Sequence, residues 1–240
     1  FKTPLREDIL ERQKKLYDEA LKNYETDPDD ADNIIWLGRR TAYIGDFRKS
    51  IAIYSRGIKK HPTDPRMYRH RAHRFITLRF FDQAISDFEK AAELIEGKPD
   101  EIEPDGIPNE RGIPVSSLHF NIWYHLGLAY YLKADFEKAL HAYEMCMKAS
   151  EIDDKVIATA HWYYMTLRRL NRKDQAEKIL ENITDDMDVI ENHHYHKCLM
   201  MYKGENTPEE VMKEAYEMGD LGLVTTGYGV ANWYNYTGDE

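Results

Sequence analysis

The sequence predicts an all-α fold in which antiparallel helix pairs stack along the chain as a solenoid. The first observation is a period of 34 residues, at which four pairs of similar residues recur: Pro28 and Pro62, Ser50 and Ala84, Tyr54 and Phe88, and Gly57 and Ala91. The second is that small residues recur where two helices must approach each other closely. Because a repeat of this kind buries its apolar face only against its neighbours, we expect one domain over residues 1–240.

Residues 123–143 carry the most complete copy of the repeat. They read Trp-x2-Leu-Gly-x2-Tyr and then Phe, Ala and Tyr, at Trp123, Leu126, Gly127, Tyr130, Phe136, Ala139 and Tyr143. This pattern resembles the tetratricopeptide repeat, in which aromatic side chains fill the space between two helices that meet at small residues. The resemblance covers nearly the whole chain. It implies a right-handed superhelix of antiparallel helix pairs.

The small residue of each second helix places the repeats along the chain. Ser50, Ala84, Ala139 and Ala176 are separated by 34, 55 and 37 residues. Complete repeats are predicted at 31–64, 65–98, 120–152, 157–186 and 189–218. In the last of these, Thr207-Pro208-Glu209-Glu210 is typical of a helix start, with an N-cap, a first-turn proline and a capping-box glutamate.

Both ends of the predicted solenoid are incomplete repeats. Residues 4–30 are predicted to form an N-terminal capping helix, since their amphipathic pattern ends at the repeat-closing Pro28. Residues 221–240 are predicted to be a first helix followed by the turn Gly238-Asp239, without the second helix. We expect a longer natural chain, or disorder beyond Glu240, because a lone first helix leaves an apolar face uncovered.

An insert at 99–118 separates the second and third repeats. It is rich in proline, glycine and acidic residues, which excludes a helix. We expect Glu103-Pro104-Asp105-Gly106 to be ordered over the first helices of repeats two and three, where its carboxylates meet the arginines of segment 66–79. Ile102, Ile107 or Ile113 is expected to anchor it. The alternatives are a mobile flap and a tolerated insert without a role.

Composition narrows the function classes. The chain has a net charge of −10, which argues against nucleic acid as a partner. It contains no run of 18 apolar residues, so no transmembrane segment is expected. Its two cysteines are too few for a disulfide scaffold. The sequence lacks a Gly-x-Ser-x-Gly motif, a P-loop and a complete dinucleotide fingerprint. We therefore expect no catalysis and no cofactor.

The repeat resemblance also implies a binding surface, since the first helix of each tetratricopeptide pair lines the concave groove. The groove side chains predicted to bind a partner are Arg39, Arg69, His73, Tyr124, Tyr131, His161 and Arg168. Arginine binds carboxylates through two parallel hydrogen bonds and stacks on aromatic faces. The sequence therefore predicts a scaffold that binds a protein or peptide with acidic or aromatic residues.

A small-ligand or metal-binding protein that uses the same groove is the alternative function. His70 and His73, and the cluster His193, His194 and His196, place imidazoles on shared helix faces, as metal sites require. No third ligand follows at a motif spacing, so we expect no metal.

A finer resemblance concerns location. The segments Trp36–Tyr43, Tyr68–Arg71, Glu103–Gly106 and Glu191–His193 are similar to an uncharacterised family of exported bacterial tetratricopeptide proteins. That likeness implies the periplasm or the outside of the cell, with the cytoplasm as the alternative. A segment preceding Phe1, such as a signal peptide, is compatible with it.

Overall fold

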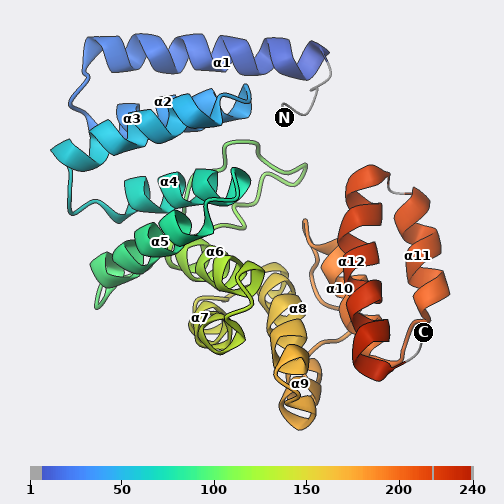
Figure 1. Ribbon diagram of the computed structural model, residues 1–240. Coiled ribbons are helices and arrows are strands. Elements are labelled where there is room, and N and C mark those ends of the chain that lie inside the picture. Colours follow the sequence, from blue (N-terminus) through green and yellow to red (C-terminus); the bar gives the residue numbers. More distant parts are fainter. Residues whose placement is uncertain (1–6, 218, 239–240) are drawn as a thin grey trace. The chain divides into compact units, whose positions relative to one another are not determined.

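The computed structural model describes residues 7–217 and 219–238, which form α-helices and no strand (Figure 1). The predicted all-α fold is confirmed. The chain divides into two compact units, one up to Pro99 and one from Asp100 onward, and each is described by itself. Residues 4–6 of the predicted capping helix and residues 239–240 of the predicted last repeat lie outside the described residues.

The first unit contains a single helix followed by two helix pairs. The helices are α1 (Glu7–Thr26), α2 (Ala31–Tyr43), α3 (Phe47–Lys60), α4 (Pro65–Thr77) and α5 (Phe81–Ile95). Aspartates start three of them: Asp30, Asp46 and Asp64 each accept a backbone N–H of the first turn of α2, α3 and α4. Each carboxylate therefore satisfies a donor that the helix itself leaves unbonded.

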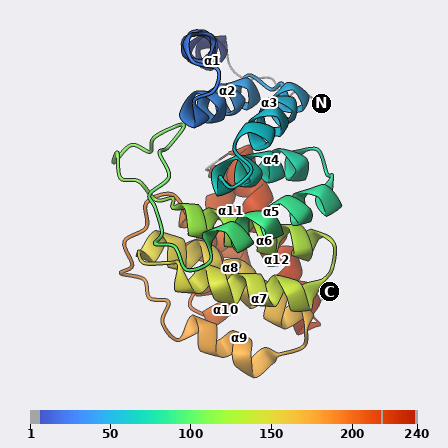
Figure 2. The same cartoon turned by 90° about the vertical axis from the view of Figure 1, so that its left-hand side faces the viewer.

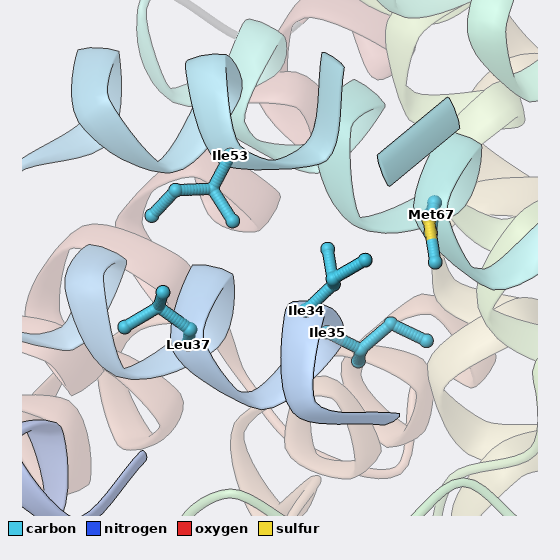
Figure 3. Close-up of a cluster of buried hydrophobic side chains, with 5 residues drawn as sticks. All are labelled: Ile34, Ile35, Leu37, Ile53 and Met67. Carbon is cyan, nitrogen blue, oxygen red and sulfur yellow. The ribbon is translucent and has the colours of Figure 1, made fainter. Parts of the chain in front are cut away.

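Apolar side chains from three helices close the core of this unit. Ile34, Ile35 and Leu37 of α2 pack with Ile53 of α3 and Met67 of α4 (Figure 3). The aromatic and aliphatic face of α1 covers the same cluster, which explains why the chain forms a helix before its first pair.

The arginines of α4 bind acids of their own unit. Arg71 makes two hydrogen bonds of 2.7 Å to the buried carboxylate of Asp87 in α5. Arg66 binds Asp64 and Asp32. Asp87, Asp64 and Asp32 of the first unit therefore already bind these two guanidinium groups, and the expected pairing of arginines with the insert stays a prediction.

The second unit contains seven helices within its described residues. They are α6 (Leu118–Leu132), α7 (Phe136–Lys148), α8 (Asp153–Arg169), α9 (Lys173–Leu180), α10 (His193–Lys203), α11 (Pro208–Glu217) and α12 (Asp220–Thr237). The predicted capping box of α11 is confirmed. Thr207 and Glu210 exchange side chain-to-backbone hydrogen bonds of 2.8 and 3.2 Å.

The insert is an extended segment that pairs with its own end before α6 begins (Figure 2). The N–H of Glu103 donates to the carbonyl of Ser116, and the N–H of Leu118 donates to the carbonyl of Glu101. The expected contact of Glu103 with the first helix of repeat three is confirmed, because the amide of Asn121 in α6 donates to the Glu103 carboxylate. The expected position over the first helix of repeat two stays a prediction. The expected anchors are wrong: Ile102, Ile107 and Ile113 are 71%, 64% and 37% exposed, whereas Val115 is buried.

In four helix pairs, a residue with a left-handed backbone conformation ends the first helix, and it does so at the equivalent position of each repeat. These residues are Gly45, Arg79, Ala134 and Asn171, all with φ between 58° and 84°. Their separations of 34, 55 and 37 residues equal those predicted from the small residues of the second helices. The repeat therefore fixes the turn as well as the helices.

None of the helices in the described part of the chain is long and apolar enough to cross a membrane.

Gly127 sets the distance between α6 and α7. A Cβ atom built at Gly127 lies 2.7 Å from the ring of Tyr143, whose side chain is fully buried. The ring of Tyr143 therefore occupies the space that any larger residue at position 127 requires.

We expect Gly127→Ala to lower the free energy of unfolding by about 1–3 kcal/mol, because overpacking forces Tyr143 out of position. Urea unfolding followed by circular dichroism measures the change. The control is Gly227→Ala in α12, where the nearest atom, Met212 Cε, is 3.9 Å from the added Cβ. The control is expected to be neutral or slightly stabilising. Equal losses in both variants contradict the close approach at Gly127.

Candidate functional site

Three first helices of the second unit meet at one place, where α6 and α10 contribute aromatic side chains and α8 contributes an alanine. Phe120 and Tyr124 of α6 and Tyr195 of α10 pack around Ala158 of α8. The hydroxyls of Tyr124 and Tyr195 lie 3.4 Å apart, although the two residues are 71 positions apart in sequence. The small side chain of Ala158 leaves room between these rings.

An open cleft of about 200 Å³ lies among these rings, and we name it the α6–α8–α10 cleft. Its walls combine aromatic faces, amides and charges of both signs. The lining residues are Val115, Ser116, Phe120, Asn121, Tyr124, His125, Asp154, Lys155, Ala158, Glu191, Asn192 and Tyr195. All of them belong to the second unit.

Lys155 places a positive charge in the wall of this cleft. Its side chain is 7% exposed, its ammonium group donates to Ser117 Oγ at 2.9 Å, and it lies 5.6 Å from the centre of the Phe120 ring. Within the described residues, Lys155 forms no ion pair. A buried cation is stable when an anion or several acceptors compensate it. An acidic group of a ligand therefore gains a charge-assisted hydrogen bond here.

Asp154 holds the start of α10, where Asn192 and Tyr195 line the cleft. Its Oδ1 atom accepts the backbone N–H groups of Ile190, Glu191 and Asn192 at 2.7, 2.9 and 3.1 Å. Its Oδ2 atom accepts the amide of Asn192 at 2.6 Å. This buried carboxylate fully engages its lone pairs, so its role is to position the loop before α10 rather than to bind a ligand.

The insert contributes the rim of the cleft. The amide of Asn121 donates to Glu103 Oε2 at 2.5 Å, and Glu103 is buried against α6. On the exposed side, Arg111 pairs with Asp188 of the loop before α10. Burial, followed by the charges of Asp154 and Asp105, raises the pKa of Glu191, while a hydrogen bond from Asn109 opposes the rise. The lining of the cleft therefore carries a cation, Lys155, as well as the carboxylates of Asp154 and Glu191.

Next to this cleft, helix α12 covers the face that the first helices α8 and α10 form. A Cβ atom at Gly229 lies 2.8 Å from Cys198 Sγ and 3.2 Å from His161 Cε1, so α12 packs directly on α10 and α8. The hydroxyl of Tyr228 is 3.4 Å from that of Tyr131, and its ring is 6.0 Å from that of Trp162. Glycine at position 229 permits this contact.

His161 lies at the centre of the ring cluster beneath α12. Its imidazole stacks on Tyr195 at 4.5 Å between ring centres and on Tyr202 at 5.8 Å, and it is 1% exposed. Within the described residues, its Nδ1 atom has no hydrogen-bond partner. Burial lowers the pKa of His161 to about 3, which keeps the imidazole neutral.

The predicted partner-binding residues fall in different environments. Tyr124 lines the α6–α8–α10 cleft. Tyr131 and His161 are buried, and Arg168 donates to Tyr164 Oη and to the carbonyl of Tyr236. Helix α12 therefore occupies part of the face that the sequence assigns to a partner.

The other three predicted residues belong to the first unit. Arg39 lies 4.4 Å above the Trp36 ring, Arg69 is buried and contacts His70, and His73 is half-buried on α4.

Three residues of the α6–α8–α10 cleft were not predicted from the sequence: Phe120, Lys155 and Tyr195. The seven-residue spacing of Tyr195 and Tyr202 is a signal of their shared helix face that was available in the sequence.

No group of three or more His, Cys, Asp or Glu side chains suited to a metal ion occurs in the parts of the chain that the structure describes.

Comparison with known proteins identifies the repeat. The family model described as Tetratricopeptide repeat matches residues 120–153, which include most of α6 and all of α7. Among proteins with curated descriptions, none matches this sequence.

Solved structures of similar fold agree with this. YrrB, a tetratricopeptide-repeat protein with an unusual peptide-binding site, has a TM-score of 0.54 and 14% identity, covering 81% of this chain and 91% of its own. A structure of MamA has a TM-score of 0.53 and 15% identity, covering 85% and 100%. A second structure of MamA has a TM-score of 0.52 and 17% identity, covering 83% and 92%. At these identities the likeness concerns the fold.

The buried imidazole makes the stability of this unit depend on pH. An unfolded chain has a histidine pKa of about 6.5. Because folding lowers the pKa of His161 to about 3, its stabilising contribution is present above pH 6.5 and is lost as the pH falls toward 3. Between about pH 7.5 and about pH 5, we expect the wild type to lose about 2 kcal/mol more than His161→Phe.

Chemical denaturation at the two pH values measures this difference. His141→Phe, which removes an exposed imidazole on α7, is the control and should keep the wild-type dependence on pH. The assignment fails if His161→Phe and the wild type lose the same free energy on acidification.

Proposed function

Because this chain folds as a tetratricopeptide-repeat protein, we propose that it is a non-catalytic scaffold that binds a peptide segment of a partner protein in the α6–α8–α10 cleft. Proteins of this fold generally serve as interaction scaffolds. YrrB, which shares the fold, carries a peptide-binding site. The cleft is formed by first helices, which is the side of the repeat from which a partner is expected to be bound.

One observation carries the proposal: Lys155 is a buried cation that lines an open cleft and makes no ion pair among the described residues. Its neighbours are the hydroxyl of Ser117 and the face of Phe120. A carboxylate of a bound peptide gives this ammonium group the partner that the protein does not provide. The rings of Tyr124 and Tyr195 offer packing surface for an adjacent aromatic or aliphatic side chain.

Glu191 influences the orientation of the peptide. It adds a carboxylate to the lining that contains the ammonium group of Lys155, and this carboxylate favours a donor or a cation of the peptide. A segment with an acidic residue followed by an apolar one therefore fits with its acidic residue at Lys155. Like charge at Glu191 disfavours the reverse orientation.

The remaining predicted residues enter the proposal in two ways. Tyr131 and His161 lie under α12 and contribute by shaping the cluster behind Tyr195. Arg39, Arg69 and His73 remain predicted contacts for a further part of the partner, on the first unit.

Peptides selected from a random display library and verified by fluorescence anisotropy test the proposal. We expect them to contain Asp or Glu and to bind Lys155→Met about 10-fold or more weakly, because a charge-assisted hydrogen bond contributes about 1.5–3 kcal/mol. Methionine keeps the length of the side chain and removes a buried charge, so the variant should fold.

Lys178→Met is the matched control, since it removes an exposed lysine of α9 that lies outside the cleft. A Tyr195→Ala variant should also weaken binding. Selected peptides that lack acidic residues, or that bind Lys155→Met and the wild type equally, would overturn the proposal.

A further inference from the structure

A second concavity lies in the same unit, at the carboxyl ends of α8 and α12 and the start of α9. It has a volume of about 330 Å³. Its lining residues are Arg168, Arg169, Asn171, Lys173, Asn235 and Tyr236. We name it the cationic pocket, because its lining within the described residues contains three basic side chains and no acidic one. The whole chain, in contrast, carries a net charge of −10.

The two arginines of the pocket are held in place without an ion pair. Arg168 donates to Tyr164 Oη at 2.9 Å and to the carbonyl of Tyr236 at 3.1 Å. The guanidinium of Arg169 lies 4.8 Å above the Phe136 ring. Neither forms a salt bridge in the described residues. Aromatic rings and a carbonyl therefore orient both groups, and each keeps N–H donors for a ligand.

Nearby carboxylates do not neutralise the pocket. Glu137 pairs with Arg172, which does not line it. Glu177 is 3.7 Å from Lys173, and both side chains are more than half exposed. Such a long, solvated pair contributes little, so the ammonium group of Lys173 can approach a ligand at low cost.

This turn differs from the three turns before it that also have a left-handed residue between the two helices of a pair. The residues that follow the left-handed position are Asp46-Phe47, Phe80-Phe81 and Asp135-Phe136 in those turns, and Arg172-Lys173 here. Two of the other turns use aspartate to cap the second helix. α9 has no side-chain cap. Arg172 and Lys173 thus stand where other turns have a capping aspartate and a phenylalanine. They lie at the start of α9, where the free N–H groups of the helix favour anions.

We propose that the cationic pocket binds a phosphate-type oxyanion, carried either by a small molecule or by a phosphorylated side chain of a protein. Two guanidinium groups and one ammonium group supply donors to several oxygens at once, and they balance a doubly charged ligand. A single carboxylate uses only one guanidinium group. Asn171 and Asn235 add amide donors at the rim. This site is separate from the α6–α8–α10 cleft and does not depend on the peptide proposal.

Isothermal titration of the full chain with inorganic phosphate, at constant ionic strength, tests the proposal. We expect saturable binding to the wild type and at least a 10-fold weaker affinity for Arg169→Gln/Lys173→Gln. Arg168 is left unchanged because it also binds α12. The control Lys148→Gln/Lys178→Gln removes the same charge from exposed lysines outside the pocket and should bind phosphate as the wild type does. Lys155→Met should also bind phosphate normally, which separates this result from the peptide proposal.

A phosphoserine peptide and acetate complete the comparison. Tighter binding of the phosphopeptide than of phosphate supports a phosphorylated protein as the source, and equal affinity supports a small molecule. Equal phosphate affinity of Arg169→Gln/Lys173→Gln and the wild type overturns the proposal. The proposal is likewise overturned if acetate binds as tightly as phosphate, because the pocket then responds to negative charge without distinguishing phosphate from a carboxylate.

Discussion

The fold depends on one contact repeated along the chain, an aromatic ring of the second helix that occupies the space left by a small residue of the first. Tyr143 fills this space opposite Gly127, and Tyr54 fills it opposite Gly38. The ring is fully buried in both pairs, so it contributes apolar burial and also fixes how closely the helices approach. Both helices of the pair, and therefore every surface that they present, take their positions from this contact.

Where the repeat loses its regularity, buried polar groups take over this positioning role. The loop before α10 has no aromatic ring to locate it, and Asp154 instead accepts three consecutive backbone N–H groups from it. The insert is attached to α6 through Glu103 and Asn121. Because a buried hydrogen bond fails when its geometry is wrong, such groups define one arrangement more strictly than apolar contacts do. The walls of the cleft come from these irregular segments.

Helix α12 covers part of the face formed by the first helices α6, α8 and α10, so it decides which residues of that face stay accessible. Its glycine at 229 allows it to reach α8 and α10, and its Tyr228 meets Tyr131 of α6. The rings around His161 are thereby covered, and two open regions remain at opposite ends of α8. One contains Lys155, and the other contains Arg168 and Arg169. α8 thus supplies basic residues to both open regions, one near its start and two near its end.

The sequence by itself determined the helices, the turns between them and the class of fold, because the 34-residue period, the Trp-Leu-Gly-Tyr pattern and the capping residues act within one or two helices. It did not determine the site. Ile102 and Ile107 were expected to anchor the insert and are exposed, while Val115 is buried. Tyr195 faces α8 because Asp154 sets the start of α10, and no local pattern encodes that hydrogen bond across 36 to 38 residues. Whether a groove residue is open or covered depended on α12, which lies far from α6 in sequence. Only the tertiary structure decides such questions, since burial is a property of what packs against a residue and not of the residue itself.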